Sequence, residues 1–468
     1  MNLTGNDLKE LGFVEGKALG LALDLVEKQY LELSFNDKLA LLKKVLNNPL
    51  SFINHATLAP VAAELMRSVD TTIALNVDGK AYQIYGAEAI EQGALQQMET
   101  AMKLPVTVAG ALMPDAHQGY GLPIGGVLAT NNAVIPYGVG VDIGCRMCMT
   151  IYDIPTDKLQ EKREDFKKLL VNNTKFGQAT FNKPKDHEIF ERKEFSELQI
   201  VREMKDRAWQ QIGSSGGGNH FVEFGVVEIS HVISEYNLAP GQYVAVLSHS
   251  GSRGLGANVA RHYTKVAMDK CKLPQEAKHL AWLDLNTEEG QEYWLAMNLA
   301  GDYASACHHQ IHERMAIGLR ETPLAMIENH HNFAWKEKDA NGKEIIVHRK
   351  GATPANRGVL GIIPGSMATP GFIVRGKGLA ESINSASHGA GRTMSRTKAK
   401  QTILQGHVNK FLREAGVELI GAGLDEAPMA YKDILQVMNY QKELVEVLGS
   451  FMPKIVRMCG DEKFQEVD

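Results

Sequence analysis

The sequence predicts an α+β protein in which one large domain, with glycine-rich loops around a β-rich core, follows a smaller helical segment. Three observations support this fold class. Over residues 1–75, apolar residues recur at three- and four-residue spacing, which is typical of amphipathic helices. From about Tyr82, short β-type runs end in glycine-rich loops. Longer helical patterns lie between these runs, over residues 155–171, 253–270 and 288–317.

These patterns divide the chain into two parts. We assign residues 1–78 to a helical N-terminal extension with a packing role, and residues 79–468 to the main domain. Within the extension, Asn36 is the expected N-cap of the second helical pattern. In the main domain, Asn341-Gly342 predicts a hairpin turn, and a closing helix is expected near residues 430–450.

The composition is ordinary for a globular protein: the 468 residues are 44% hydrophobic and 22% charged, with a net charge of −5. The chain has no apolar run of about eighteen residues, so we expect no membrane span. Its first residues, MNLTGNDLKE, lack the profile of a signal peptide. Five cysteines are too few and too scattered for a disulfide framework in so long a chain. We therefore expect a cytoplasmic protein whose thiolates stay free to bind metal.

One segment is strongly basic although the whole chain is acidic. Asp and Glu are absent between Ser382 and Arg413, and this stretch contains six positive charges, at Arg392, Arg396, Lys398, Lys400, Lys410 and Arg413. Such a patch attracts a polyanion. Alternatively, it is a solvated face that acidic residues elsewhere in the fold balance.

The glycine-rich loops suggest nucleotide binding, but the common signatures are absent. The sequence has no GxxxxGK(S/T) phosphate loop and no KxDG motif, which marks ligases that form a lysine–nucleotide adduct. The glycines of GSSGGGNH precede a strand-like segment and not a helix, unlike those of a dinucleotide-binding loop.

Several side chains that commonly bind metals lie beside these glycines. In GVGVDIGCRM, a glycine-containing turn allows the carboxylate of Asp142 and the thiolate of Cys145 to converge on one point. In GGGNHFVEFG, strand alternation places His220 on one face and Asn219 with Glu223 on the other. One strand can therefore direct an imidazole at a metal, and an amide and a carboxylate at a ligand.

Further histidines add to this set. His249 ends a β-type run in LSHSGSRGLG, and only one of the adjacent His330 and His331 is expected to serve a site, because neighbouring side chains rarely point the same way. His308 and His312 have the spacing of a metal pair, but a polar helix face explains them more simply. Each histidine alone is more often structural. Their repetition in loops and at strand ends favours a common site.

The residue types indicate the class of ligand. A thiolate, a carboxylate and several imidazoles suit Mn, Fe, Co or Zn better than Ca. A shared thiolate could bridge two ions, and two-metal centres promote in-line displacement at phosphorus. Ser366, in PGSMATPG, could bind phosphate oxygens. His388, in SASHGAGR, is flanked by small residues that leave its ring open to a metal ion, a proton or an electrophilic phosphorus.

Nine motifs, in order along the chain, resemble those of the RtcB family of RNA-splicing ligases: MPDAHQGYGLPIGG, GVDIGCRM, GGGNHFVE, LSHSGSRGLG, HHN, HRKGATPA, PGSMATPG, SHGAGR and DEAPMAYK. They span about residues 105–432. The resemblance implies a single family-specific α+β fold, with residues 79–468 as the catalytic domain. It also implies a ligase that uses GTP and Mn2+ to join an RNA 3′-phosphate or 2′,3′-cyclic phosphate end to an RNA 5′-hydroxyl end.

The same resemblance assigns five metal ligands. Asp142, Cys145 and His220 would hold one Mn2+ ion. Cys145 would also bind a second ion, together with His249 and His331, so that its thiolate bridges the pair.

The remaining roles implied by the resemblance concern GTP. His388 resembles the nucleophile that forms a covalent histidine–GMP adduct, and Asp115 would orient its imidazole. Asn219 would contact phosphate, and Glu223 the guanine edge. The other phosphate and base contacts correspond to Ser366, Arg392 and Tyr431.

One departure from the family pattern concerns the C-terminus. Family members end in a short Val-Lys-Gly tail whose lysine reaches the guanine, whereas this chain ends in MPKIVRMCGDEKFQEVD. Lys463 has a different spacing, so the resemblance does not assign it the guanine contact.

Two other activities fit many of the same residues. A family relative could cap nucleic-acid 3′-phosphate ends with GMP and stop there. A metal-dependent phosphoesterase would need the two metal ions but no nucleotide, which leaves His388, Asn219 and Glu223 without a purpose. A non-catalytic RNA-binding protein would need neither the metal ligands nor the nucleophile. The sequence does not identify the physiological RNA, the oligomeric state or the need for an activating protein of the archease type.

Overall fold

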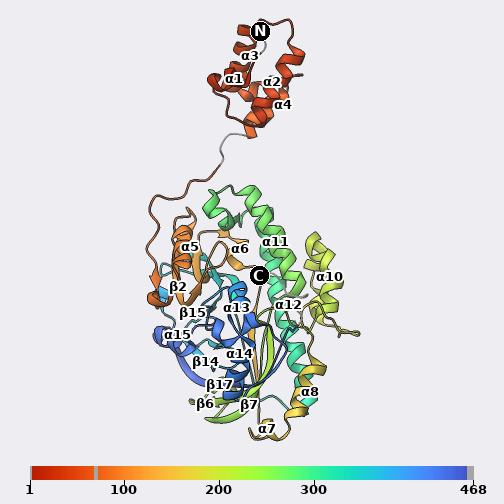
Figure 1. The fold of residues 1–468 in the computed structure, drawn as a ribbon, viewed down its shortest axis with the longest axis vertical. Helices are drawn as coiled ribbons and strands as arrows, with labels where there is room; N and C mark the ends of the chain where they lie inside the picture. Colours follow the sequence, from red (N-terminus) through yellow and green to blue (C-terminus); the bar gives the residue numbers. More distant parts are fainter. Residues whose placement is uncertain (1–2, 68–71, 461–468) are drawn as a thin grey trace. The chain divides into compact units, whose positions relative to one another are not determined.

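The structure of the protein is a computed structural model that describes residues 3–67 and 72–460 (Figure 1). It divides into two compact units, Met1–Ile73 and Ala74–Asp468. The assignment of an extension to residues 1–78 and a catalytic domain to 79–468 stays a prediction, because compactness does not show which unit carries the activity. Lys463 lies outside the described residues.

The N-terminal unit is helical. Its α-helices are α1 (Gly5–Leu11), α2 (Lys17–Gln29), α3 (Phe35–Asn47) and α4 (Ala59–Arg67). One apolar cluster, which includes Leu8, Val26, Leu42 and Val61, fills the space between them. The N-terminal unit therefore has its own hydrophobic core.

The prediction of Asn36 as a helix N-cap was wrong. Helix α3 begins at Phe35, and its cap is Ser34, two residues before Asn36. The backbone of Ser34 is extended, and its hydroxyl accepts a hydrogen bond from the backbone N–H of Asp37. Asn36 therefore lies inside the first turn.

The second unit combines helices and strands, which confirms the predicted α+β class. The two longer predicted helices correspond to α11 (Arg253–Lys270) and α12 (Glu288–Leu319). The pattern over 155–171 is divided between α7 (Lys158–Glu161) and α8 (Arg163–Asn173). The other α-helices are α5 (Gln92–Met102), α6 (Pro136–Val139), α9 (Glu194–Glu197), α10 (Gln199–Gln211), α13 (Arg396–Thr402), α14 (Gln405–Ala415) and α15 (Ile434–Tyr440). Its short 3-10 helices are η2 (Ala87–Ala89), η3 (Glu188–Glu191), η4 (Ser234–Tyr236), η5 (Gln275–Leu280), η6 (Ala380–Ser382), η7 (Leu424–Glu426) and η8 (Pro428–Ala430), whereas η1 (Pro49–Phe52) belongs to the N-terminal unit.

One sheet of the second unit has five strands in the order β1-β2-β3-β11-β10. They are β1 (Gln83–Ile84), β2 (Thr107–His117), β3 (Ile124–Thr130), β11 (Glu344–Lys350) and β10 (Asn332–Lys338). Strands β10 and β11 pair antiparallel, and Gly342 has a φ of 78° in the turn between them, which confirms the predicted hairpin. Two short pairs join β4 (Ala133–Val134) to β8 (Leu283–Asp284) and β12 (Ala352–Pro354) to β15 (Ser385–Ser387).

The larger sheet has eight strands, of which seven follow the order β13-β14-β17-β6-β7-β5-β9 and β16 pairs with β17. They are β5 (Arg146–Tyr152), β6 (Phe221–Ile229), β7 (Gly241–Ser250), β9 (Ala325–His330), β13 (Leu360–Ile363), β14 (Gly371–Gly376), β16 (Glu418–Ile420) and β17 (Val445–Met458). The closing helix predicted near 430–450 was wrong in its second half, because α15 ends at Tyr440 and the chain continues as β17. Strand β17 pairs with β14 on one edge and β6 on the other, and this tertiary pairing overrides the local helical pattern.

The eight-stranded sheet is packed on both faces. Along β7, Val246 belongs to an apolar cluster with Ile311 of α12, whereas Leu247 belongs to a different cluster. Because side chains alternate along a strand, His249 lies on the same face as Leu247, and Ser248 lies on the face of α12. The two faces therefore carry different polar groups at the end of β7.

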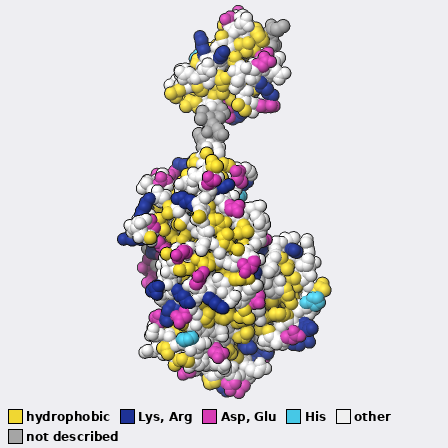
Figure 2. Space-filling model, turned by 90° about the vertical axis from the view of Figure 1, so that its left-hand side faces the viewer, with side chains coloured by type: hydrophobic (Ala, Val, Ile, Leu, Met, Phe, Trp, Pro, Cys, Tyr) yellow, Lys and Arg dark blue, Asp and Glu magenta, His cyan; other side chains and the backbone are white. Residues whose placement is uncertain are grey.

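On the face of the molecule drawn in Figure 2, Lys and Arg side chains lie among Asp, Glu and hydrophobic side chains. This mixed surface agrees with a chain whose net charge is only −5. Among the described residues, no helix combines the length and the apolar character needed to cross a membrane.

Candidate active site and metal centre

The candidate metal ligands gather at one end of the central strands of the larger sheet. Cys145 directly precedes β5 and His220 directly precedes β6, whereas His249 lies near the end of β7 and His331 follows β9. Neighbouring strands here are antiparallel, so the starts of β5 and β6 and the ends of β7 and β9 share an edge, and Phe221 pairs directly with His249. The sheet thereby brings together residues from four separate motifs.

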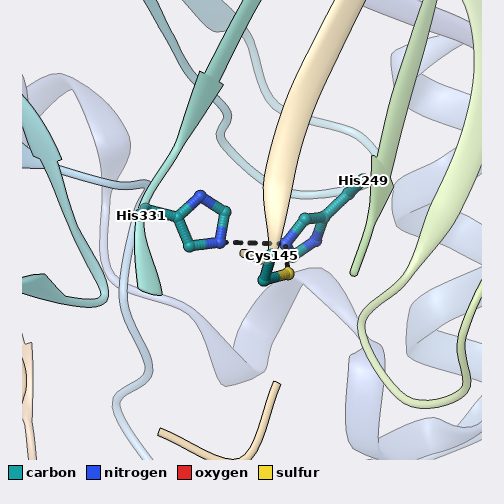
Figure 3. Close-up of side chains that lie close together, drawn as sticks. All are labelled: Cys145, His249 and His331. Atoms are coloured by element: carbon teal, nitrogen blue, oxygen red, sulfur yellow. Dashed lines mark hydrogen bonds between the residues drawn. The ribbon is translucent and has the colours of Figure 1, made fainter. Parts of the chain in front are cut away.

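Cys145, His249 and His331 form the first group of potential ligands (Figure 3). The sulfur of Cys145 lies 3.1 Å from His249 Nε2. His249 Nε2 in turn lies 3.3 Å from His331 Nε2. All three side chains are buried, and the Nδ1 atom of His331 has no hydrogen-bond partner among the described residues. Three ligand atoms thus point toward one small volume.

Asp142, Cys145 and His220 form a second group that shares the thiol with the first. His220 Nε2 lies 3.4 Å from the Cys145 sulfur and 3.0 Å from Asp142 Oδ2. A shared sulfur between two sets of nitrogen and oxygen atoms is the arrangement that a bridging ligand requires.

The protonation of these groups suits metal binding. Burial holds the pKa of both His249 and His331 well below its ordinary value, so each imidazole is neutral and keeps a lone pair. His249 Nδ1 lies 3.2 Å from the carbonyl oxygen of Asn219, which can only accept, so Nδ1 carries the hydrogen and Nε2 the lone pair. Burial alone would raise the pKa of Asp142, but its interactions with His220, Cys145 and Arg253 together outweigh burial, and the pKa is lowered. These residues therefore fit a divalent transition-metal ion.

Two glycines allow this close approach. A Cβ atom at Gly216 would lie 1.7 Å from His220 Nδ1, and a Cβ atom at Gly251 would lie 1.9 Å from Asp142 Oδ1. Both distances are far below van der Waals contact. The glycines in GSSGGGNH and LSHSGSRGLG are thus needed for space beside the ligands.

His388 and Asp115 form a pair next to the metal ligands. The Nδ1 atom of His388 lies 2.6 Å from Oδ2 of Asp115, which also accepts a hydrogen bond from the backbone N–H of His388 at 3.1 Å. Asp115 belongs to β2 and is fully buried, while His388 directly follows β15. The ring of His388 lies 5.0 Å from that of His331, centroid to centroid. The nucleophile candidate therefore borders the candidate metal centre.

A single cavity of about 870 Å³ connects these groups. It is lined by the five candidate metal ligands, by His388, and by the predicted nucleotide contacts Asn219, Glu223, Ser366, Arg392 and Tyr431. Asp115 is the one predicted site residue outside this lining, and it lies behind His388 as its hydrogen-bond partner.

Arg392 and Tyr431 lie together over a buried carboxylate. The guanidinium of Arg392 lies 5.2 Å from the centre of the Tyr431 ring, and the Tyr431 hydroxyl donates a hydrogen bond to Glu426. Burial, followed by the charge of Glu426, holds the pKa of Tyr431 well above its ordinary value. Glu426 was missed as a site residue, although it is part of the quoted motif DEAPMAYK. Only its burial, which the sequence does not display, distinguishes it from a surface acid.

Glu223 and Ser366 present neutral polar groups to the cavity. Burial raises the pKa of Glu223 well above its ordinary value, which favours the neutral carboxyl, a group that can both donate and accept. The hydroxyl of Ser366 lies 2.9 Å from that of Thr369, which also accepts a hydrogen bond from Ser366 N at 2.6 Å. This turn fixes the direction of the serine side chain.

The basic segment after Ser382 is partly neutralised inside the fold. Arg396 lies 2.8 Å from a Glu426 oxygen, Arg392 lies 3.5 Å from the other oxygen, and Lys400 lies 3.9 Å from Asp425. Lys410 also lies 3.9 Å from Glu414, so at least four of the six cations have acidic partners, as the alternative interpretation of this segment anticipated. The expectation of an RNA contact stays a prediction.

The structure also shows which of the other predicted histidines reach the candidate site. His330 stacks on Trp335 at 4.9 Å, so of the adjacent pair only His331 reaches the site. His308 and His312 are buried, so the prediction of a polar helix face was wrong. Ligand atoms of Cys148, His308 and His312 lie within 4.8 Å of one another, which is close enough to hold a metal ion.

Hydrogen bonds provide another explanation for this buried histidine pair. The hydroxyl of Ser248 lies 2.6 Å from His308 Nδ1 and 2.7 Å from His312 Nε2. The opposite nitrogens contact the carbonyl of Ser250 and the hydroxyl of Thr150. Every ring nitrogen of the pair has a partner, so this group stabilises the packing of α12 on the sheet.

Comparison with known proteins gives a consistent result. The family model described as tRNA-splicing ligase RtcB matches residues 97–199 and 166–458. The chain belongs to the RtcB family. One similar protein is the RNA-splicing ligase RtcB of Escherichia coli (strain K12), which is 33% identical over 77% of this chain and 92% of that protein. Another is the tRNA-splicing ligase RtcB of Aeropyrum pernix, which is 31% identical over 73% of this chain and 86% of that protein. The RNA-splicing ligase RtcB homolog 1 of Entamoeba dispar is 30% identical over 74% of this chain and 77% of that protein. The RtcB match begins at residue 97, within the second unit, which also contains the Cys/His cluster.

Proposed function

We propose that this RtcB family member is an RNA ligase that joins a 3′-phosphate or 2′,3′-cyclic phosphate end to a 5′-hydroxyl end, with GTP consumed as a substrate. The observation that carries the proposal is the Asp115–His388 pair, which lies beside two potential metal groups that share Cys145. A hydrolytic metal centre needs no such pair, whereas a covalent nucleotidyl transfer does.

His388 is the proposed nucleophile. A carboxylate can only accept, so the hydrogen between His388 Nδ1 and Asp115 resides on Nδ1, and Nε2 keeps its lone pair. Burial by itself raises the pKa of Asp115, but its interactions with His388 and then Lys432 lower the pKa overall, so it stays ionised. The carboxylate can therefore also stabilise the positive charge that develops on the ring as Nε2 forms a new bond.

The proposed reaction proceeds in three steps, each of which transfers a group at phosphorus. Nε2 of His388 forms a bond to the α-phosphorus of GTP while the bond to the β-phosphate oxygen breaks, and pyrophosphate leaves. An oxygen of the RNA 3′-phosphate then takes GMP from His388, after water has opened any cyclic phosphate. Finally the RNA 5′-hydroxyl oxygen attacks the 3′-phosphorus and gives its proton to water, while the phosphoanhydride bond to GMP breaks and GMP leaves.

The other cavity residues have supporting roles in this proposal. Asp142, Cys145, His220, His249 and His331 would hold two Mn2+ ions, which would supply positive charge against the phosphates. Arg392 and the Ser366 hydroxyl would contact phosphate oxygens, with the amide of Asn219. The protonated carboxyl of Glu223 can donate to and accept from a base edge, and Tyr431 would pack beside the base.

The test is incubation of the purified protein with Mn2+ and α-labelled GTP or ATP, followed by a denaturing gel. We expect acid-labile label from GTP on the protein, and its loss in His388→Ala. His407→Ala, an exposed histidine, is the matched control and should label normally. Label from ATP alone would refute guanine selectivity, and label from neither nucleotide on metal-loaded protein would favour a phosphoesterase.

RNA substrates separate ligation from capping. Joining of a 3′-phosphate RNA to a 5′-hydroxyl RNA supports the proposal, whereas accumulation of a GMP-capped 3′ end that is never joined supports a capping enzyme. The assay is then repeated with a protein of the archease type. This comparison tests whether multiple turnover needs such a partner when a single round of ligation does not.

A further inference from the structure

The rim of the cavity carries an aromatic side chain for which the proposed reaction gives no role. Tyr120, in the loop between β2 and β3, is 60% exposed and lines the same cavity as His388. Among the described residues, it is the most exposed Phe, Tyr or Trp side chain. Exposed, rigid aromatic rings beside a binding cavity commonly serve recognition.

Two other aromatic rings pack against Tyr120. It contacts Tyr137 at 6.2 Å and 64° and His279 at 6.2 Å and 71°, both in edge-to-face geometry. Tyr137 and His279 stack on each other at 5.2 Å. The exposed ring is therefore held by two partners that also support each other.

The backbone of this loop is also fixed. The Nζ atom of Lys350 donates a hydrogen bond to the carbonyl of Tyr120 at 2.6 Å and lies 5.0 Å from the centre of the Tyr137 ring. Gly121 has a φ of 68°, and a Cβ atom there would lie 2.9 Å from the carbonyl oxygen of His279 in η5. Only a glycine allows the loop to lie this close to η5. Tyr120 is thus pre-positioned at the rim.

We propose that Tyr120 is a stacking platform for an unpaired base of the RNA end that enters the cavity; this inference rests on the RNA ligase function proposed above. Every base has a π face, so one exposed ring can accept RNA ends of any sequence. The guanine of GTP could use the same chemistry. A mononucleotide that reacts at His388 can lie wholly inside the cavity, whereas an RNA strand has to leave it across the rim, where Tyr120 lies.

The experiment compares Tyr120→Ala, Tyr120→Phe and Tyr120→Trp in two assays of the full chain. With Tyr120→Ala we expect the KM for RNA to rise roughly 5- to 100-fold, the equivalent of one stacked base, while guanylylation of His388 keeps its rate and its KM for GTP. The Phe and Trp variants should restore the KM for RNA. Tyr236→Ala, at the opposite end of β6 and β7, is the control and should change neither assay.

A substrate with one abasic nucleotide at the 3′ or the 5′ end completes the test. The wild-type protein should lose affinity for the RNA whose missing base would stack, and Tyr120→Ala should lose nothing further with that RNA. An unchanged KM for RNA in Tyr120→Ala, or equal additive losses for both abasic substrates, overturns the inference. A raised KM for GTP also overturns it, because the stacked base then belongs to the nucleotide. Absence of guanylylation in the wild-type protein would refute the proposed function, and this inference with it.

Discussion

At the scale of single residues, one hydrogen bond determines which nitrogen of His388 is free to react. Asp115 fixes the hydrogen on Nδ1 and supplies a full negative charge at 2.6 Å. We expect Asp115→Asn to slow guanylylation by roughly 10²- to 10⁴-fold, because an amide is a weaker acceptor and does not balance the cationic ring. The rate of protein labelling by α-labelled GTP measures this. Bound metal should be unchanged in the variant, and a rate within a few-fold of wild type would contradict the role of Asp115.

The glycines beside the metal ligands give a second prediction. In Gly216→Ala the new methyl group would displace the His220 ring, so we expect a clear loss of bound metal. Elemental analysis after loading with Mn2+ and dialysis measures it, and thiolate-to-cobalt absorption after Co2+ loading reports the Cys145 site independently of activity. Gly406→Ala, where a Cβ atom meets nothing within 4 Å, is the control. Full metal content in Gly216→Ala would show that His220 is not a ligand.

Sequence reasoning identified eleven of the residues that line the cavity, because they lie in recognisable motifs, most of which contain glycine. It missed Glu426 and Tyr120, although both belong to motifs that were quoted. Glu426 differs from a surface acid only by burial between Arg392, Arg396 and Tyr431, and these contacts form only in the folded chain. The spacing in ACHHQIHERM also suggested an exposed face, whereas the serine of β7 that satisfies both rings lies about sixty residues away.

At the scale of secondary structure, the sequence predicted elements well where local periodicity is long. Helix α11 has the predicted bounds, and α12 differs by two residues at its end. The prediction failed for β17, whose residues are paired on both edges by strands distant in sequence. Local patterns carry no information on such partners, so the segment looked helical.

The cap of α3 gives a prediction at this scale. Ser34→Ala removes the acceptor for Asp37 N–H and should destabilise the helix by about 1 kcal/mol, which is roughly a fivefold change in an opening equilibrium. Amide hydrogen exchange across residues 35–47 should accelerate accordingly. Asn36→Ala, inside the first turn, should leave exchange nearly unchanged. A larger effect of Asn36→Ala than of Ser34→Ala would mean that Asn36, and not Ser34, caps the helix.

At the scale of the whole molecule, the site depends on contacts between distant parts of the second unit. Asp115 and His388 are 273 residues apart in sequence, and Cys145 precedes β5 whereas His331 follows its antiparallel neighbour β9. The order of motifs could therefore indicate a common site. The reason they meet is the pairing of β5 with β7 and β9 and of β6 with β7, together with the packing of β15 against β2.

All candidate site residues, from Asp115 to Tyr431, lie in the second unit, and the family match begins at residue 97. The first unit has its own apolar core. We therefore expect a chain that begins at Ala74 to keep the guanylylation rate of the full chain within about twofold, since the metal ligands, the nucleophile and its partner are all retained. Labelling by α-labelled GTP, with metal content and circular dichroism as checks of integrity, measures this.

If the shortened chain were folded and metal-loaded but failed to label, the N-terminal helices would contribute directly to nucleotide transfer. If it labelled normally but joined RNA poorly, those helices would act on the RNA step instead, and the role of residues 1–78 would be substrate binding and not packing.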